Sequence, residues 1–551
     1  MKKALFIAPM MVAVLASCSS DEPTVDNGTQ EGMSSFLSVN LVNTPSMPIG
    51  RATGDAGNYE DGIGNENKVN TVRFYFFDAD GNSAFVKNGT ASYLDWTPAG
   101  DEAGDAPNVE KTLTATLIIN TKEGDKVPAS VIAVVNPSST LLNQTVSTID
   151  GLNDIVADHS AADAFVMSNS VYSRGGSKME AVSVAGHLSS SAADAIKNPV
   201  DIYVERVVAK VRLSISDELI QSNGLISTGK DKSGNEYTFD GEKIYVKFLG
   251  WNVTATADKS YLMKSINPAW ANNLFGTNDW NYSPYFRSFW AVNPASLNYG
   301  YFKFDKEAGA ANMLPFEVTA DANNWTYIQE NAASDFNTGA NPVNPTKAII
   351  AAQLVNEQGE PMEFGEWASV KYSVADLKKA MLASSNLYKV TAGETETTYN
   401  AITTDDVELV TAEALGVADK ETPGRYRVYL QLTETAKAAT WQMGSEKDTP
   451  ATDADKVLKD LGAAQVWEEG YTYYYFDIQH IGTGETGNIG VVRNHLYDAV
   501  INTLNGLGTP VYDPDQTIYP EKPENDGTYI AARINILSWR YVYQDIDLDW
   551  K

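Results

Sequence analysis

The chain has 551 residues, of which 71 are acidic and 41 are basic, so its formal net charge is −30 at pH 7. A surface with this charge repels nucleic-acid phosphates and anionic lipid headgroups, which argues against nucleic-acid binding and against a basic membrane-binding patch. Hydrophobic residues make up 43% of the chain, which is enough for buried cores, and the length predicts two domains. Because Cys18 is the single cysteine, no disulfide forms within the molecule.

The first 18 residues have the pattern of a lipoprotein signal peptide. Lys2 and Lys3 precede an apolar stretch over 4–14, which is too short to span a bilayer as a permanent helix. Residues 15–18, Leu-Ala-Ser-Cys, resemble the bacterial lipobox, in which small residues admit the peptidase and the cysteine thiol carries a thioether-linked diacylglycerol. We predict that Cys18 is lipidated and that the precursor carries palmitate. The alternative is an ordinary signal peptide with an incidental cysteine.

A polar tether follows, and then a segment with the pattern of a single strand. Residues 35–42 alternate, with Leu37, Val39 and Leu41 on one face and polar residues such as Ser38 on the other. This period of two, with β-branched residues, predicts one half-buried strand that ends before two nearby prolines.

Arg51 lies shortly beyond this strand, in a stretch of small residues expected to be extended and accessible. It is the first basic residue after Lys3, so a protease specific for arginine meets one clear target between the lipid and the first domain. We predict cleavage between Arg51 and Ala52, which makes residues 19–51 a propeptide with a removable strand. The alternative is an incidental loop arginine.

From about residue 70 onward, short β patterns alternate with turns rich in Gly, Asn and Pro, and helical patterns are few. We predict a mainly β protein with two β-sandwich domains, 52–216 and 217–526, divided near the Gly-rich stretch 224–234. The acidic run 78–82 is expected to be a hairpin turn and not a calcium loop, because its glycine falls too early for an EF-hand. Strands are expected over 72–76, 113–119, 131–135, 203–213, 244–253, 347–354, 425–432 and 471–478, and helices over 373–382 and 453–461.

No arrangement of side chains indicates catalysis. The four histidines (His159, His187, His480 and His495) lack metal-ligand spacing, and the processed chain has no nucleophilic cysteine. Sequence motifs of hydrolases, phosphate-binding loops and zinc proteases are missing. We therefore predict that the protein is not an enzyme and has no catalytic residue, cofactor or metal.

Several segments together resemble the fimbrillin family, the stalk pilins of type V pili in Gram-negative anaerobes, and in particular its minor-type stalk (shaft) subunits. In chain order these segments are LASC at 15–18, MPIGRA at 47–52, VERVVAKV at 204–211, KSYL at 259–262, VVRNHLY at 491–497, GLGTP at 506–510 and INILSW at 534–539. Residues 385–470 match none of the family's motifs.

This resemblance implies transthyretin-like sandwich domains, a lipidated precursor attached to the outer membrane, and proteolysis after Arg51. It also implies polymerisation by strand exchange with other copies of the chain and with accessory pilus subunits.

The C-terminal part of the chain has a composition suited to strand donation. Residues 509–526 contain four prolines, which cannot donate in a β-ladder, so we expect an extended connector. Residues 527–551 are then the predicted donor strand; the alternative is an ordinary terminal strand of the second sandwich. Its alternating face and the aromatic residue beyond it comprise Ile530, Ala532, Ile534, Ile536 and Trp539.

The leading functional hypothesis is a structural subunit of a fimbrium on the extracellular cell surface, supporting adhesion to a host or bacterial surface ligand. A tip adhesin or glycan-binding surface lipoprotein is the alternative, because aromatic residues of the second half can stack on sugars. Scattered aromatics in sandwiches are also ordinary core residues. The aromatics in question are Trp270, Trp280, Trp290 and Trp325. A secreted hydrolase is a third hypothesis, but it lacks a site.

Overall fold

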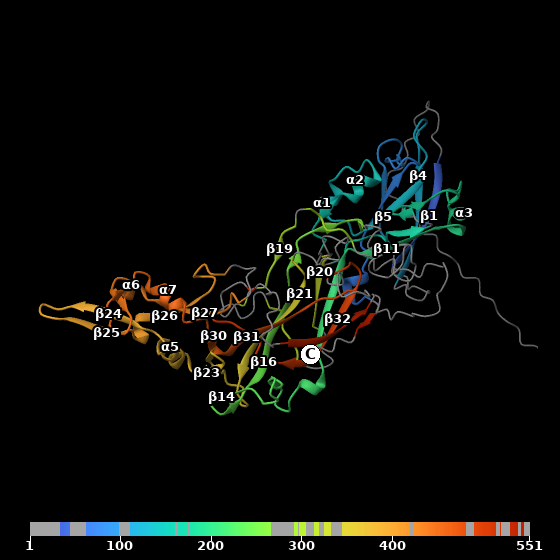
Figure 1. Cartoon of the computed structure of the whole chain (residues 1–551). Helices are drawn as coiled ribbons and strands as arrows, with labels where there is room; N and C mark the ends of the chain where they lie inside the picture. The colour runs from blue at the N-terminus through green and yellow to red at the C-terminus, as the bar shows by residue number, and fades with distance from the viewer. Residues whose placement is uncertain are drawn as a thin grey trace, which may run out of the picture.

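The structure is a computed structural model of the chain (Figure 1), and it is mainly β with a few short helices. This confirms the predicted fold class. The residues that it describes are 34–43, 62–98, 111–159, 164–174, 177–265, 291–295, 297–302, 304, 313–318, 324–331, 344–418, 424–480, 490–513, 518, 529–537 and 542–544.

The first domain is built on one eight-stranded sheet, ordered β3-β2-β5-β7-β11-β1-β4, with β10 beside β5. One hydrophobic core takes side chains from strands across this sheet, so the sheet curves around it. A second cluster on the other face packs against the short helices α1 and α2. The strands are β1 (Ser34–Asn43), β2 (Val72–Phe77), β3 (Tyr93–Trp96), β4 (Lys111–Asn120), β5 (Ser130–Val135), β7 (Met167–Asn169), β10 (Val182–Ser183) and β11 (Val200–Arg206).

Smaller elements complete the first domain. Asp78 accepts hydrogen bonds from the backbone of Asp80 and Asn82, which closes the predicted turn after β2. Thr148 and Ser191 cap α2 and α3 in the same way. The elements are η1 (Gly64–Asn67), α1 (Ser139–Leu142), α2 (Ile149–Asn153), β6 (Val156–Ala157), β8 (Tyr172–Arg174), β9 (Ser177–Met179) and α3 (Ala192–Lys197).

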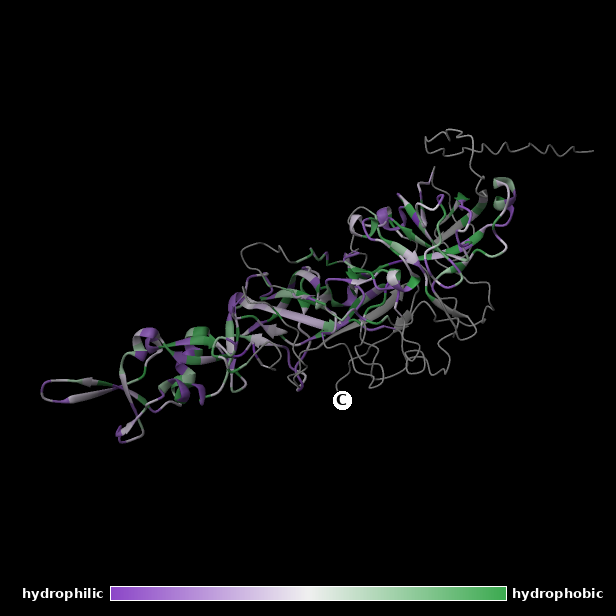
Figure 2. Cartoon of the chain, turned by 90° about the horizontal axis from the view of Figure 1, so that it is seen from above, coloured by the Kyte–Doolittle hydropathy of each residue, from purple (hydrophilic) through white to green (hydrophobic). Residues whose placement is uncertain are grey.

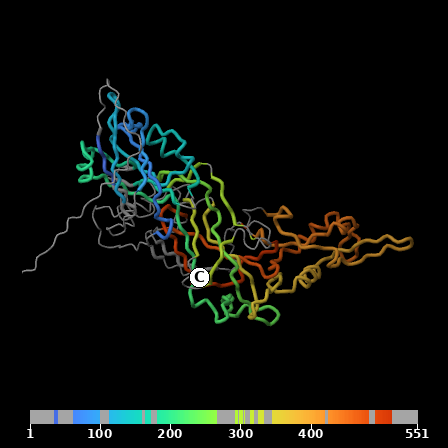
Figure 3. Tube along the Cα trace, turned by 180° about the vertical axis from the view of Figure 1, so that it is seen from behind, coloured from blue at the N-terminus to red at the C-terminus, as the bar shows by residue number. Residues whose placement is uncertain are grey.

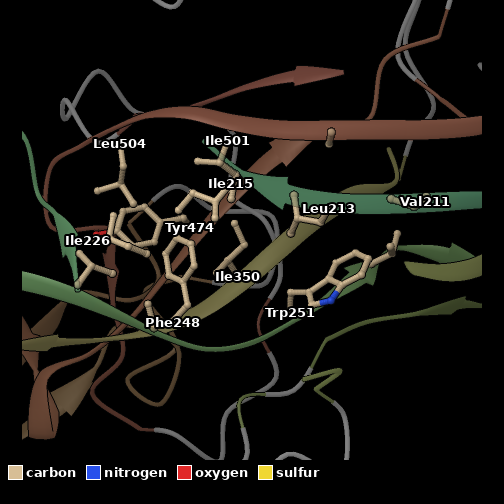
Figure 4. Close-up of a cluster of buried hydrophobic side chains, with 14 of the residues drawn as sticks. Val211, Leu213, Ile215, Ile226, Phe248, Trp251, Ile350, Tyr474, Ile501 and Leu504 are labelled. Atoms are coloured by element: carbon tan, nitrogen blue, oxygen red, sulfur yellow. The ribbon is translucent and has the colours of Figure 1, made fainter. Parts of the chain in front are cut away.

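The second domain has two five-stranded sheets, ordered β20-β12-β32-β34-β35 and β13-β16-β21-β31-β33. Side chains from both sheets share one buried cluster, and Figure 4 shows Leu213, Trp251, Ile350 and Tyr474 within it. The strands are β12 (Val208–Ile215), β13 (Ile226–Ser227), β16 (Tyr245–Thr254), β20 (Asn324–Gln329), β21 (Lys347–Val355), β31 (Tyr471–Asp477), β32 (Leu496–Asn505), β33 (Thr509–Pro510), β34 (Tyr529–Leu537) and β35 (Val542–Gln544). Shorter elements are η2 (Asp217–Leu219), β14 (Thr238–Phe239), β15 (Glu242–Lys243), β17 (Thr256–Ala257), β18 (Ser260–Tyr261), β19 (Tyr299–Gly300) and η5 (Glu468–Gly470).

The single strand expected over 203–213 is two strands that belong to different sheets. β11 ends at Arg206 in the first sheet, and β12 begins at Val208 in the second. Between them, Val207 donates its backbone N–H to the Val166 carbonyl, which continues the register of β11 with β7 by one residue. The chain therefore leaves the first sheet at Val207, ahead of the predicted boundary at residue 216. The apolar alternation changes phase at this point, because the even positions up to Val204 enter the first core and the odd positions from Ala209 onward enter the second. The prediction of one continuous strand overlooked this signal.

Residues 364–467 form a lateral lobe that projects from the second domain (Figures 1 and 2). The lobe has a hydrophobic cluster of its own, and it starts and ends on the paired strands β22 and β30. Its helices α5 and α7 confirm the two predicted helices, with Ser373 and Asp453 as N-caps. The elements are β22 (Phe364–Trp367), β23 (Val370–Tyr372), α5 (Val374–Leu382), β24 (Leu387–Ala392), β25 (Thr397–Ala401), η4 (Thr404–Asp406), β26 (Val407–Thr411), β27 (Val428–Leu432), α6 (Glu434–Lys437), β28 (Thr440–Met443), β29 (Thr449–Pro450), α7 (Ala454–Lys459) and β30 (Gln465–Trp467).

Within the part of the chain that the structure describes, every helix is too short or too polar to cross a membrane.

Candidate functional site

The predicted removable strand lies inside the first sheet and not at its edge. β1 pairs antiparallel with β4 over ten residues and parallel with β11 over five. Val39 lies between Ala115 on β4 and Val200 on β11, and both Leu37 and Val39 are fully buried in the first core. Leu41 pairs with Leu113 and Ile202 through its backbone. The two buried side chains therefore confirm the inward face predicted for this strand.

The opposite face of β1 is more buried than its polar pattern predicts. Ser38 is 0% exposed, although it belongs to the face expected to be polar. The Phe36 backbone exchanges two hydrogen bonds with Ser189, and α3 follows directly in the chain and contacts β1. The Ser38 hydroxyl has no hydrogen-bond partner there. The strand is thus enclosed on both faces around Ser38, which corrects the prediction of a half-buried strand.

β4 depends on β1 for its place in the sheet. Among the described strands, β4 has β1 as its only sheet neighbour, because it stands last in the strand order. Removing β1 would therefore open a gap one strand wide between β11 and β4, lined by the apolar side chains on which Leu37 and Val39 pack.

The predicted donor strand is found as β34, on a sheet of its own chain. It pairs antiparallel with β32 over nine residues, and only the three-residue β35 lies outside it in the described part of the sheet. Ile530, Ala532, Ile534 and Ile536 lie on this strand, paired through their backbones with Leu504, Ile501, Ala499 and Tyr497. Cys18, Arg51, Ala52 and Trp539 lie outside the described residues.

A buried charged cluster, the interdomain joint, connects the two domains. We define the joint as Glu66, Arg206, Lys210, Glu330 and Arg493, all of them 3% exposed or less.

On one side of the joint, the Lys210 ammonium lies 2.7 Å from Glu66 Oε1, and the Tyr327 hydroxyl donates to the same carboxylate. Burial and that carboxylate raise the pKa of Tyr327. Arg206 donates to the Glu66 carbonyl at 2.6 Å and to the Asn494 side chain at 3.2 Å, so it bridges the two domains.

On the other side of the joint, Arg493 forms an ion pair with Glu330 at 2.6 Å and is itself 0% exposed. Its guanidinium also donates to the carbonyls of Tyr261 and Leu262, and the Leu262 carbonyl accepts from Ser168 of the first domain. Each charge is therefore paired with an opposite charge or with carbonyls, as buried charges require.

The joint brings together segments that are far apart in the sequence. The stretch 204–211 supplies Arg206 and Lys210, the stretch 491–497 supplies Arg493, and the stretch 259–262 supplies two of its carbonyl acceptors. These stretches are among those that carry the family resemblance, but their acidic partners Glu66 and Glu330 were not predicted. Nothing local distinguishes those two glutamates from the many solvated carboxylates of an acidic chain.

The sugar-binding alternative has weak support in the described residues. Trp325 lies on β20 with the Lys210 ammonium 4.9 Å from its ring centroid, and the other three candidate tryptophans lie outside those residues. A cavity of about 380 Å³ near β20 has both polar and apolar walls, but Asp258 already accepts from Asn298 and Asp158 already accepts from Gln329. Among the described residues, no group of three His, Cys, Asp or Glu side chains could hold a metal ion.

Residues 465–545, which extend from β30 through β35, match the family model described as major fimbrial subunit protein type IV, fimbrillin, C-terminal. This region belongs to the fimbrillin family. The match includes the Arg493 side of the joint and β34, so the family resemblance is confirmed where the predicted donor strand lies. The minor-type assignment stays a prediction. No curated protein matches the chain.

Solved structures of low identity align with most of the chain. One is a candidate cell adhesion protein from Parabacteroides distasonis, with 14% identity, a TM-score of 0.41 and coverage of 93% of this chain and 99% of the other. Another is the tip fimbrial protein Mfa3 from Porphyromonas gingivalis with C-terminal truncation, with 11% identity, a TM-score of 0.31 and coverage of 92% and 100%. Both TM-scores are below 0.5, so these likenesses do not establish a shared domain arrangement.

Changing Glu330→Gln tests the joint, because it leaves the buried Arg493 guanidinium without its counter-charge. We expect the free energy of unfolding to fall by about 3–5 kcal/mol, measured by chemical denaturation. The matched control is Glu434→Gln in the exposed pair with Lys437, for which we expect a change within about 0.5 kcal/mol. Equal effects of the two changes would show that the joint does not stabilise the fold.

His159 makes the stability depend on pH. Burial, and then the positive charge of Arg493, lowers its folded-state pKa to about 4. The unfolded chain has the ordinary histidine pKa of about 6.5. Between these values only the unfolded chain takes up the proton, so the unfolding free energy decreases as the pH falls from 6.5 toward 4.

We expect this residue to contribute a loss on the order of 3 kcal/mol across that window, measured by urea titrations at pH 7 and pH 4.5. His159→Leu should flatten the pH dependence. The control His187→Leu, at a half-buried position, should keep the wild-type dependence. Identical slopes for all three proteins would contradict the assignment.

Proposed function

We propose that the chain is a structural subunit of a fimbrium, which polymerises when β1 is replaced by the C-terminal strand of a neighbouring copy. The observation that carries this proposal is the place of β1, which is an early segment of the chain and yet the strand that joins β4 to β11. A gap with two open ladder edges and an apolar floor is a site for strand addition from another chain.

The precursor in this proposal is lipidated at Cys18, held at the outer membrane and cut after Arg51 by an arginine-specific protease. Arg51 follows Asn43, the last residue of β1, by only eight residues. Cleavage there separates β1 from the body of the chain and leaves it held by the two ladders and by the packing of Leu37 and Val39. The strand then leaves as the donor enters.

β34 is suited to this role by length and pattern. Its nine residues match the ten of β1, and its apolar residues recur at every second position. On its own sheet only the three-residue β35 lies outside it, and β35 belongs to the same C-terminal segment, so the two strands can be withdrawn together without dividing the sheet. Several apolar side chains at about 1.5–3 kcal/mol each, with about eight ladder hydrogen bonds at about 1 kcal/mol each, would hold a non-covalent filament together.

The enclosed position of Ser38 selects a register for the donor. The residue that replaces Ser38 must be small, because Ser38 is fully buried and α3 contacts β1. On β34 the residues between the apolar positions are Ala531, Arg533 and Asn535, and only Ala531 is no larger than serine. We therefore place Ala531 of the donor at the position of Ser38, opposite Thr116 on β4 of the acceptor.

Paired cysteines at Ala531 and Thr116 test this register. Facing strand residues have Cα atoms about 4.5–5.5 Å apart, which suits a disulfide. We expect mature Ala531→Cys, Thr116→Cys protein to form a ladder of covalent oligomers on non-reducing gels. The control pair Ala531→Cys, Thr114→Cys is two residues out of register and should form few oligomers.

The same double variant with Arg51→Ala should stay monomeric, because β1 then keeps its place. Deleting residues 527–551 should likewise prevent filaments in negative-stain images. Filaments from either protein, or equal cross-linking of both cysteine pairs, would refute strand exchange as proposed.

Ser38→Ala should stabilise the precursor, because it removes a buried hydroxyl that has no partner. We expect the unfolding free energy to rise by about 1 kcal/mol and filament growth after cleavage to slow, since β1 is then held more tightly. The control Ser35→Ala, at a half-buried position of the same strand, should change stability by less than about 0.5 kcal/mol. A destabilised Ser38→Ala precursor would contradict the argument.

A further inference from the structure

The lateral lobe ends in a hairpin whose outer strand has no described neighbour. β24 and β25 form this hairpin at the far end of the lobe, distant from the first domain in both Figure 1 and Figure 3. The lobe sheet has the order β25-β24-β28-β29, so β25 is an edge. All five residues of β25 are exposed.

Hydrogen bonds at the two ends of the hairpin define which backbone groups face outward. Gly393 donates to the Glu396 carbonyl, and Ile402 donates to the Leu387 carbonyl. Bonded pairs recur at every second position of an antiparallel ladder, so Thr398 and Asn400 bond to β24. The N–H and C=O groups of the alternate residues therefore point away from β24, at Thr397, Tyr399 and Ala401.

This edge lacks the features that usually prevent pairing with another chain. Edge strands are commonly protected by proline, by lysine, by a bulge or by very short length. The opposite edge of the same sheet, β29, has two residues and contains Pro450. β25 has the sequence Thr-Thr-Tyr-Asn-Ala, with no charge, no proline and a regular register, in a chain with a net charge of −30.

We propose that β25 pairs antiparallel with β25 of a second copy, about a two-fold axis at Tyr399. In this register Tyr399 faces its own symmetry mate, and Thr397 faces Ala401 of the second copy. Each outward N–H group of one β25 strand then lies opposite an outward C=O group of the other strand. Asn400 faces Thr398, so no like charges are opposed, in contrast to the repulsion expected over most of this acidic surface.

The β25 contact is expected to join filaments side by side. This part of the inference rests on the proposed function, because it requires that the chain forms filaments. One five-residue pair buries too little surface for a stable dimer of free subunits. A filament repeats the lobe along its length, so many weak contacts act together. The inference therefore gives the lobe, which matches no family motif, the role of lateral association between fimbriae.

Cysteine cross-linking tests the pairing without requiring filaments. The test uses the full chain with Cys18→Ser and Arg51→Ala at high concentration under mild oxidation. Symmetry-related residues at 399 have Cα atoms about 5.5 Å apart, within the disulfide range, whereas those at 398 are diagonal neighbours about 7–8 Å apart. We expect Tyr399→Cys to form covalent dimers about tenfold faster than Thr398→Cys. Equal rates would overturn the proposal.

Filament bundling tests whether the β25 pairing joins filaments side by side. Tyr399→Pro removes an outward N–H and leaves the bonds to β24 intact, whereas Tyr399→Thr keeps the N–H. We expect the proline variant to form filaments of normal length whose bundled fraction, in negative-stain images, falls about tenfold. The threonine variant should bundle like the wild type.

Wild-type bundling by the proline variant, or equal loss in both variants, would overturn the inference. If the wild type formed no filaments, the proposed function would fail, while the cross-linking rates would still decide the pairing of β25.

Discussion

A strand inside a sheet must satisfy hydrogen bonds along both of its edges, and β1 does so between β4 and β11. The consequence is that, among the described strands, β4 pairs only with a segment that precedes the rest of the domain; its one other backbone link is a bridge from Asn120 to residues 86–88. If the first strand of the chain lay at the edge of its sheet, its loss would only make the sheet one strand narrower. Here its loss divides the sheet, so the first domain is complete only while some strand occupies that place.

The unsatisfied hydroxyl of Ser38 is consistent with a strand that occupies this place for a limited time. An enclosed polar group without a partner costs about 1–3 kcal/mol, and the surrounding residues offer Ser38 no compensating bond. A strand that must later leave does not need the tightest packing, and a small residue still allows it to enter.

The interdomain joint fixes the orientation of the first domain relative to the second. Leu262 and Met263 join an apolar cluster of the first domain, and the Phe165 ring of that domain contacts Tyr327 of the second. Buried ion pairs with additional carbonyl contacts have strict geometry, so they favour one arrangement of the two domains over others. The cost of burying these charges is offset only while every partner is in place, which links domain orientation to folding.

Alternating apolar residues and turn chemistry were enough to predict a mainly β protein, the strand at Leu37 and Val39, and the capped helices at Ser373 and Asp453, because these signals are local. Periodicity does not reveal which strands are neighbours. It therefore concealed the enclosure of Ser38, the separate core of the lateral lobe, and the choice of Glu66 and Glu330 as partners for buried cations. Those features depend on contacts between residues that are tens to hundreds of positions apart. Only the folded chain decides them, since pairing and burial are properties of neighbours in space and not of neighbours in sequence.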